Sequence, residues 1–147
     1  MKIAIANDHA GVEYKNILSN HLRSKGYEVI NFGTDELSSC DYPDYAKQVA
    51  LAVQSKKADA GVLICGTGIG MSICANRFKG VRASVCDNIL TAKMTRRHND
   101  SNVLCMGARI IGIDLMLAIA DEYFSTPFDE EEIADKHTRR INKIEEV

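Results

Sequence analysis

Five short apolar runs alternate with amphipathic stretches along the chain, and this alternation is the strongest constraint on the fold. The runs are "KIAIAN" (2–7), "YEVINF" (27–32), "AGVLIC" (60–65), "RASVC" (82–86) and "NVLCM" (102–106). Continuous apolar strands are typical of a sheet buried on both faces, and helices between consecutive strands require parallel pairing with right-handed crossovers. The sequence therefore predicts an α/β fold, a three-layer α/β/α sandwich around a five-stranded parallel sheet.

The stretches between the runs carry apolar residues at helical spacing. They predict helices over about 11–25, 45–56, 68–78, 89–98, 112–124 and 130–145. Residues 33–44 are polar, contain a proline and are expected to form a loop. With 147 residues and no linker or repeat, the chain is expected to form a single Rossmann-like domain over 1–147.

Composition excludes several classes of function. The net charge of −2, without a basic block, argues against a nucleic-acid partner. No run of about 18 apolar residues exists to span a membrane, and Asp8 and His9 interrupt the N-terminal run too early for a signal peptide. Five cysteines without a CxxC pair predict free thiols and a cytoplasmic location, and the four histidines show no metal-ligand spacing, so we expect no metal.

In open parallel sheets, ligands bind at the carboxyl ends of the strands, where the winding reverses. This rule selects the loops that follow each predicted strand. They are residues 8–11, 33 onward, 65–70, 87–88 and 107–109.

The loop after the third strand, "CGTGIGMS" (65–72), contains alternating glycines at Gly66, Gly68 and Gly70. A dinucleotide fingerprint needs G-x-G-x-x-G after the first strand, but here Met71 stands at the third glycine position. A phosphate-binding Walker loop fails because no Gly-Lys-Ser/Thr follows. Two interpretations remain: a cradle of main-chain N–H groups for an anion or a developing oxyanion, and a tight turn that needs glycine for its geometry alone.

Cys65 stands where this strand ends and the next helix begins. A helix N-terminus favours the thiolate form of a cysteine, which makes Cys65 a candidate catalytic base, with core packing as the alternative. Cys74, Cys86 and Cys105 are expected to pack in the core as uncharged thiols.

Asp8 and His9 end the first strand, and they are candidates for binding sugar hydroxyls or phosphate or for moving a proton. The alternative for Asp8 is helix capping. Arg109 follows the fifth strand and a glycine, so it can bind an anion or pair with an acid.

The segment "RRHND" (96–100) ends the fourth predicted helix. His98 there is a functional candidate or a surface histidine, while Asn99 and Asp100 can simply form the turn. In the last predicted helix, Lys136 and Arg140 are four residues apart and share a face, which is either an anion site or a solvated charged surface.

Four segments resemble the family of ribose-5-phosphate isomerase B and galactose-6-phosphate isomerase. These are "NDHAG" (7–11), "DYPDYA" (41–46), "LICGTGIGMSICANRFKGVRA" (63–83) and "RRHNDSNVL" (96–104). The resemblance covers essentially the whole chain. It implies an aldose–ketose isomerase without a cofactor, which acts on a sugar phosphate through a cis-enediolate.

The resemblance also implies residue roles. Cys65 resembles the base that moves a proton between C1 and C2, His98 the acid that opens the furanose ring, and Thr67 the group that assists proton exchange between the sugar oxygens. The substrate contacts that it implies are Asp8 (also in a catalytic role), His9, Tyr42, Gly66, Thr67, Gly68, Ile69, Gly70, Ser72, Asn99 and, for the phosphate, Arg109, Lys136 and Arg140.

Family sites are shared between subunits, so a homodimer or a dimer of dimers is implied. His98 would then serve Cys65 of the partner subunit, and the C-terminal helix would extend to that subunit. Because this chain carries both Cys65 and His98, a self-sufficient homo-oligomer acting on ribose 5-phosphate is favoured. A six-carbon sugar phosphate, such as allose or galactose 6-phosphate, and a non-catalytic sugar-phosphate or nucleotide-binding module are the alternatives.

Two departures from the family pattern stand out. "DEEEIADKHTRR" (129–140) replaces the usual Gly-Gly-Arg-His, which puts Lys136 in an arginine position, where a point charge replaces a bidentate fork. Asn7 stands where a cysteine or a small residue is usual, and we expect little effect from that change.

Overall fold

The structure, a computed structural model, describes residues 1–128 and 134–147. Its centre is a five-stranded sheet in which every neighbouring pair is parallel, with the order β2-β1-β3-β5-β4. The strands are β1 (Lys2–Asn7), β2 (Glu28–Asn31), β3 (Ala60–Cys65), β4 (Ala83–Val85) and β5 (Val103–Gly107). The predicted five-stranded parallel sheet is confirmed.

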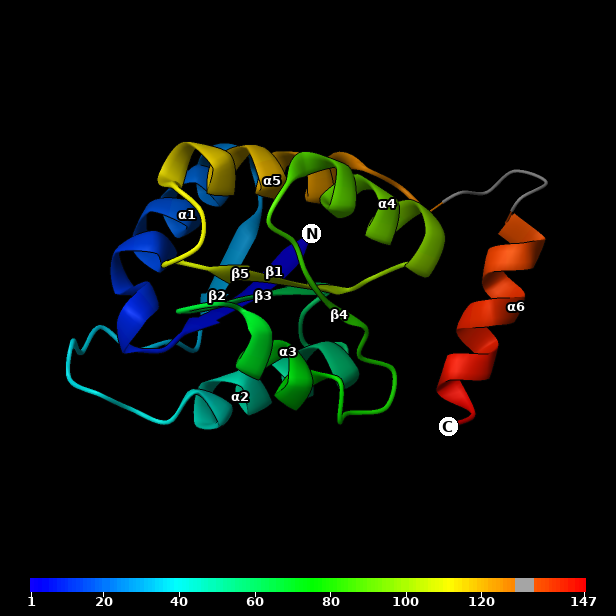
Figure 1. Ribbon diagram of the computed structural model, residues 1–147, viewed down its shortest axis with the longest axis horizontal. Helices are drawn as coiled ribbons and strands as arrows, with labels where there is room; N and C mark the ends of the chain where they lie inside the picture. Colours follow the sequence, from blue (N-terminus) through cyan, green and yellow to red (C-terminus); the bar gives the residue numbers. More distant parts are fainter. Residues whose placement is uncertain (129–133) are drawn as a thin grey trace.

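Helices cover both faces of the sheet. They are η1 (His9–Gly11), a single 3-10 turn, followed by α1 (Val12–Ser24), α2 (Tyr42–Gln54), α3 (Ile69–Ala75), α4 (Ile89–Asn99), α5 (Ile113–Ser125) and α6 (Ala134–Glu145). Figure 1 shows α1, α4 and α5 on one face and α2 and α3 on the other, so the three-layer sandwich is confirmed. No helix in the described ranges is both long and apolar enough to cross a membrane.

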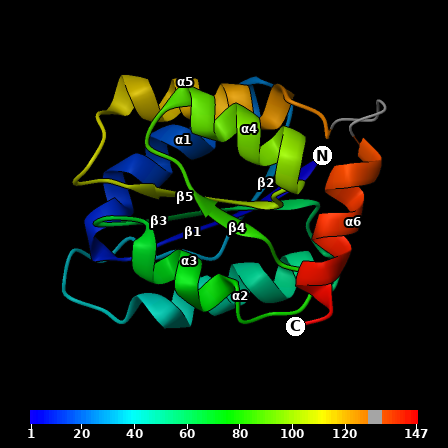
Figure 2. The same cartoon turned by 45° about the vertical axis from the view of Figure 1, so that its right-hand side comes forward.

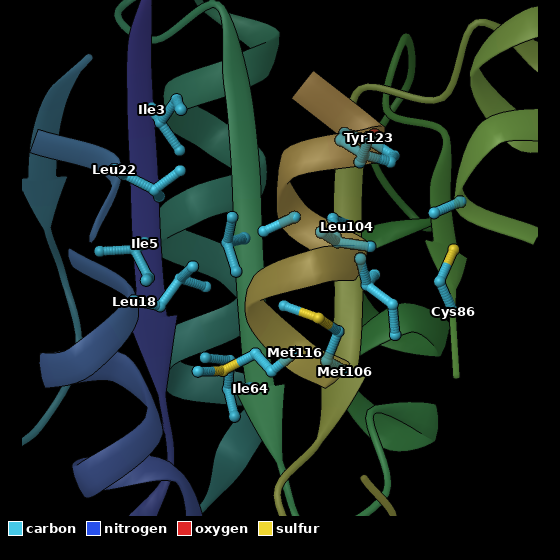
Figure 3. Close-up of a cluster of buried hydrophobic side chains, with 14 of the residues drawn as sticks. Ile3, Ile5, Leu18, Leu22, Ile64, Cys86, Leu104, Met106, Met116 and Tyr123 are labelled. Atoms are coloured by element: carbon cyan, nitrogen blue, oxygen red, sulfur yellow. The ribbon is translucent and has the colours of Figure 1, made fainter. Parts of the chain in front are cut away.

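Alternation within β1 sends its large and its small side chains to opposite faces of the sheet. Ile3 and Ile5 point into the larger core beneath α1 and α5 (Figure 3), whereas Ala4 and Ala6 belong to the core beneath α2 and α3. Successive side chains of a strand face opposite sides, so the small residues all lie on one face. That face admits α2 at close range.

Gly61 of β3 is a point of close approach to α2. A Cβ placed on Gly61 would lie 2.5 Å from Cγ1 of Val49 on α2 and 3.2 Å from Cγ2 of Val103 on β5. No side chain larger than hydrogen fits there without displacing the helix.

Two predicted boundaries are wrong by three residues, each for a local reason. Helix α2 begins at Tyr42 and not at 45, because Pro43 is suited to the first turn of a helix, where no N–H is needed. Helix α3 ends at Ala75 and not at 78, because the side chain of Asn76 pairs with the main chain of Ala83, accepting at 2.7 Å and donating at 2.9 Å.

Helix α6 stands outside the sandwich, beyond the C-terminal end of α4, with which it is in contact (Figures 1 and 2). Residues 129–133, the start of the last predicted helix at 130–145, lie outside the described residues. The yellow loop after β5 lies at the left of Figure 1 and α6 at the right, so α6 is at the amino-end side of the sheet.

The close approach of α2 gives a test of the packing. We expect Gly61→Ala to lower the free energy of unfolding by about 1–3 kcal/mol, because the added methyl overpacks the contact with Val49. Chemical denaturation measures this. Val49→Ala removes the opposing methyl groups, so the double variant is expected to lose less stability than the two single variants summed; simple additivity would contradict the proposed contact.

Candidate active site

The candidate site lies where the winding of the sheet reverses, between β1 and β3. The chain passes from β1 outward to β2, then returns to build β3 on the other side of β1. Asn7 pairs with Ile64 at the carboxyl ends of these strands, and the Asp8 N–H donates to the Ile64 carbonyl at 3.1 Å. The residues that follow, Asp8 and Cys65, therefore lie next to each other at the carboxyl edge of the sheet, where ligands bind in such folds.

The glycine loop is held tightly against the end of β5. Gly68 has a φ of +78°, and a Cβ on it would lie 2.9–3.1 Å from main-chain atoms of Met106. A Cβ on Gly107 would in turn lie 2.8 Å from the main chain of Thr67. Two main-chain hydrogen bonds hold the loop against the end of β5. The Ala108 N–H donates to the Cys65 carbonyl at 2.8 Å, and the Arg109 N–H donates to the Gly66 carbonyl at 3.0 Å. Glycine is therefore required at positions 68 and 107 for geometric reasons, because it lets the glycine loop lie directly against the end of β5.

Cys65 stands at the entrance of this loop. Its side chain is 5% exposed, and its Sγ accepts a hydrogen bond from the Gly68 N–H at 3.1 Å. The sulfur is therefore enclosed and is engaged by one main-chain hydrogen-bond donor.

The other cysteines differ from Cys65 in their surroundings. Burial raises the pKa of Cys86 to about 11 and that of Cys105 well above its usual range. Both lie in the core as expected. Cys74 is only half-buried, and burial together with the Asp44 carboxylate raises its pKa. These three thiols stay protonated at neutral pH, and all five cysteines are free.

Tyr42 and Arg109 flank the glycine loop. A Cβ on Gly70 would lie 2.6–3.0 Å from the ring atoms of Tyr42, and one on Gly66 would lie 3.4 Å from Nη1 of Arg109. Arg109 is exposed and forms no ion pair with the described residues, which favours anion binding over pairing with an acid.

Asp8 and His9 follow β1 and form the part of the candidate site beside the end of β3. Asp8 is 6% exposed, and its Oδ1 caps η1 by accepting from the Ala10 N–H at 2.9 Å. The capping alternative is therefore correct for Oδ1, while Oδ2 lies 4.0 Å from Nδ1 of His9. That nitrogen accepts from the Cys40 N–H at 3.3 Å, so a neutral His9 ring carries its proton on Nε2 and can donate it outward.

Sequence reasoning missed the residues that hold the segment of Asp8 and His9 in place. The Asn7 amide donates to the carbonyls of Asp8 (2.8 Å) and Thr34 (3.0 Å), and the Lys15 ammonium donates to the same Thr34 carbonyl at 3.1 Å and pairs with Asp35. Lys15 is fully buried. A signal was available, because Lys15 falls on the apolar face of α1 together with Leu18 and Leu22. Asn7, from which we expected little, anchors the segment after β2 beneath His9.

The remaining loop residues are held by local bonds. The Thr67 hydroxyl accepts from the Ile69 N–H at 3.2 Å, and the Ser72 hydroxyl donates to the Ile69 carbonyl at 2.7 Å. Thr67 is exposed, so its hydroxyl proton remains available to a ligand, whereas Ser72 is buried and keeps only an acceptor role.

His98 and Asn99 are not brought to Cys65 within the chain. They end α4, and the chain enters β5 at Val103, which pairs with Gly61 at the opposite end of β3 from Cys65. Gly61 and Cys65 are four residue steps apart along β3, which is about 13 Å. Lys136 and Arg140 lie on α6, at this same distant end, and both are exposed.

A further residue in this second group went unrecognised. The ring of His137 on α6 stacks on that of His98, with centroids 4.5 Å apart and planes inclined by 16°. His137 is 7% exposed. Its position next to Lys136 was visible in the sequence, but its proximity to His98 depends on how α6 packs.

No group of three or more metal-ligating side chains occurs among residues 1–128 and 134–147. The expectation of a site without metal stays a prediction.

Comparisons with known proteins agree with this class of fold. The family model described as Ribose/Galactose Isomerase matches residues 3–144. Ribose-5-phosphate isomerase B of Escherichia coli is 43% identical over 97% of this chain and 93% of its own length. The structure of the Clostridium thermocellum ribose-5-phosphate isomerase B is 46% identical with a TM-score of 0.95, covering 99% of this chain and 96% of that one.

The Mycoplasma genitalium enzyme, solved with bound ribulose-5-phosphate, is 37% identical with a TM-score of 0.92 over 99% of this chain and 94% of that one. An α/β sandwich with a ligand loop at its switch point defines the class. Within that class, the chain belongs to the ribose/galactose isomerase family.

The loop geometry gives a test that is independent of substrate. We expect Gly68→Ala to lower any activity of the site by about 100-fold, because a Cβ cannot occupy both a φ of +78° and the contact with Met106, and the N–H leaves the sulfur. Steady-state kinetics and the rate of Cys65 alkylation measure the effect.

Gly112→Ala is the matched control, since a Cβ there meets nothing within 4 Å and φ is −78°. If both variants keep wild-type activity and alkylation rate, the geometry of the loop is not required.

Proposed function

We propose that this protein is an aldose–ketose isomerase that interconverts ribose 5-phosphate and ribulose 5-phosphate through a cis-enediolate, without a cofactor. The observation that carries the proposal is the enclosed Cys65 thiol, with its Sγ 3.1 Å from the Gly68 N–H at the switch point of the sheet. The family membership and the bound ribulose-5-phosphate of the Mycoplasma genitalium relative support the choice of substrate.

The chemistry requires one base and one stabilised oxyanion. The Cys65 thiolate removes the proton from C2 of the open-chain aldose, and the electron pair forms the C1–C2 double bond of an enediolate. Negative charge then develops on the former aldehyde oxygen, for which the remaining main-chain N–H groups of the 66–70 loop are the proposed donors, since those of Gly68 and Ile69 already donate to Cys65 Sγ and to the Thr67 hydroxyl. Each well-placed donor contributes about 3 kcal/mol of transition-state stabilisation.

The reaction is completed by two proton transfers. A proton passes from the C2 oxygen to the C1 oxygen, for which the exposed Thr67 hydroxyl is the proposed relay, and the Cys65 thiol returns its proton to C1. Asp8 is proposed to assist these transfers through its Oδ2, because its Oδ1 is committed to the cap. No redox partner is consumed, because one carbon gains the electrons that its neighbour loses.

The sugar and its phosphate are bound by the surrounding groups. His9, Tyr42, Asn99 and the 66–70 main chain are proposed to contact the sugar, with Ile69 and Ser72 shaping the start of α3. Arg109, Lys136 and Arg140 are proposed to bind the phosphate, and the exposure of all three side chains supports this role.

Ring opening is assigned to His98, which resembles the acid of the family. Because His98 lies at the other end of the sheet from Cys65 of its own chain, we propose that two copies of the chain share each site. The phosphate-binding face of α6 would reach the partner in the same way.

Exposed apolar side chains support an association of two copies. Ile69 and Ile73 on α3 are 54% and 63% exposed, and Leu90 at the start of α4 is 63% exposed. Ile110, beside the glycine loop, is 59% exposed. Large apolar groups gathered near a site typically mark an interface. A homodimer or a dimer of dimers satisfies this arrangement. The cytoplasmic location of the protein stays a prediction.

The proposed base is tested by Cys65→Ser. We expect isomerisation of ribose 5-phosphate to fall by at least about 10²–10⁴-fold, since a serine hydroxyl is a poor base. Exchange of solvent deuterium into C1 of ribulose 5-phosphate should be lost as well, because it requires the same enediolate but no ring chemistry. NMR measures both.

Cys74→Ser is the control and should retain activity. Cys74 lies on α3, the helix that follows the Cys65 loop, and its pKa is raised. Allose and galactose 6-phosphates are assayed in parallel. Faster turnover of a six-carbon substrate would replace the pentose assignment, and ligand-induced thermal stabilisation of the wild type without ketose would favour a non-catalytic binding module.

The shared site is tested by complementation. Cys65→Ser and His98→Asn are each expected to be inactive toward ring-closed ribose 5-phosphate. Refolded together in equal amounts, they should recover about a quarter of the wild-type activity, because half of the dimers are mixed and each mixed dimer has one intact site. Size-exclusion chromatography with light scattering confirms the dimers. Absence of recovery in verified mixed dimers would show that one chain supplies both residues.

A further inference from the structure

Arg82 and Glu145 connect the two elements that carry the distant half of the proposed site, α4 and α6. We propose that this pair is a latch that positions α6, and with it the phosphate-binding side chains, against the His98 end of α4. The inference rests on the proposed function and adds two positioning residues, neither of which touches the substrate.

Arg82 caps the end of α4 that carries His98. Its Nε donates to the carbonyls of Asn99 (3.0 Å) and Asp100 (3.2 Å), and its Nη2 donates to the Asp100 carbonyl at 2.9 Å. A cation at a helix C-terminus satisfies the carbonyls that have no partner in the helix. The residues immediately after His98 are thereby fixed.

Asp100 completes this cap with its carboxylate. It has a left-handed φ of +44°, Oδ2 accepts from Arg82 at 3.2 Å, and Oδ1 accepts from Arg96 at 2.9 Å. A non-glycine residue in this conformation persists only when its surroundings hold it. The two arginines supply that restraint, so Asp100 does more than form a turn.

The remaining Arg82 nitrogen reaches α6. Nη1 donates to Oε1 of Glu145 at 2.7 Å, and the other oxygen, Oε2, accepts from the Gly80 N–H at 3.0 Å. Both carboxylate oxygens are therefore used to hold the last turn of α6. The two side chains are 18% and 28% exposed, so the ion pair is only partly screened by solvent.

The other end of α6 is held by a different contact. His137 stacks on His98, eight residues or about 12 Å along the helix from Glu145. Two attachments at this spacing restrict both the tilt and the sliding of α6. Arg140 lies between these points and Lys136 lies immediately before the first of them, and both remain exposed, which suits side chains that must meet an anion.

Glu145 allows the latch to be opened without disturbing the cap. In Glu145→Gln, Arg82 keeps its bonds to Asn99 and Asp100, so α4 retains its end and only α6 is released. Glu146→Gln is the matched control, because it removes the same charge one residue later from an exposed side chain that forms no ion pair with the described residues.

The test compares these two variants with the wild type. In Glu145→Gln we expect the KM for ribose 5-phosphate and the dissociation constant of inorganic phosphate, measured by calorimetry, to rise together by about fivefold, with kcat within about twofold. Glu146→Gln should match the wild type in all three quantities. Thermal unfolding is followed in parallel.

Phosphate affinity in Glu145→Gln equal to that in Glu146→Gln overturns the latch, and so does a lower melting temperature with unchanged phosphate affinity, since either result leaves only a structural role. Phosphate binding needs no turnover, so this readout is separate from the proposed function. That function fails instead if the wild type produces no ribulose 5-phosphate.

Discussion

The pairing of β3 with β1 on one side and with β5 on the other is the constraint on which the site depends. This register sets Cys65 opposite Gly107 and Ile64 opposite Asn7, so three strand ends terminate at one level. The glycine loop then has to turn within the space left by Met106 and Gly107, which only Gly68 permits. The N–H that reaches the Cys65 sulfur is a consequence of that turn, so a shift of the register by one residue would displace the proposed base and its hydrogen-bond donor together.

The sandwich supplies only half of the proposed chemistry from each copy of the chain. Cys65 and the loop lie at the carboxyl edge of the sheet, while His98 and α6 lie at the amino edge, because every helix of a parallel crossover carries the chain back to the start of the next strand. A residue at the end of such a helix cannot reach the switch point of its own sheet. The proposed association of two copies would resolve this separation, and it would give a role to the hydrogen bonds and the ion pair by which Arg82, Asp100 and Glu145 hold the end of α4.

Much of the fold was predictable because its signals are local. Continuous apolar strands at regular spacing are sufficient to predict a parallel α/β sheet, and the strand-end rule directs attention to Asp8, Cys65 and Arg109. The start of α2 and the end of α3 were predicted wrongly, since Pro43 and Asn76 act through a helix turn and a side-chain pairing that composition does not reveal. Lys15 was missed although its place on the apolar face of α1 was visible in the sequence, because its partner, the Thr34 carbonyl, was not. Arg82 gave no such signal, and only its contacts with the distant carbonyls of Asn99 and Asp100 give it a specific role.

The sequence by itself determined the parallel sandwich, the glycine loop with its cysteine and the family to which the chain belongs, because these depend on residue type and on spacing within short segments. The tertiary structure alone decided the order β2-β1-β3-β5-β4, the hydrogen bond from Gly68 to the Cys65 sulfur, the stack of His137 on His98 and the attachment of α6 through Glu145. Those features join residues that are far apart along the chain, and their partners are selected by packing geometry, which no local pattern records.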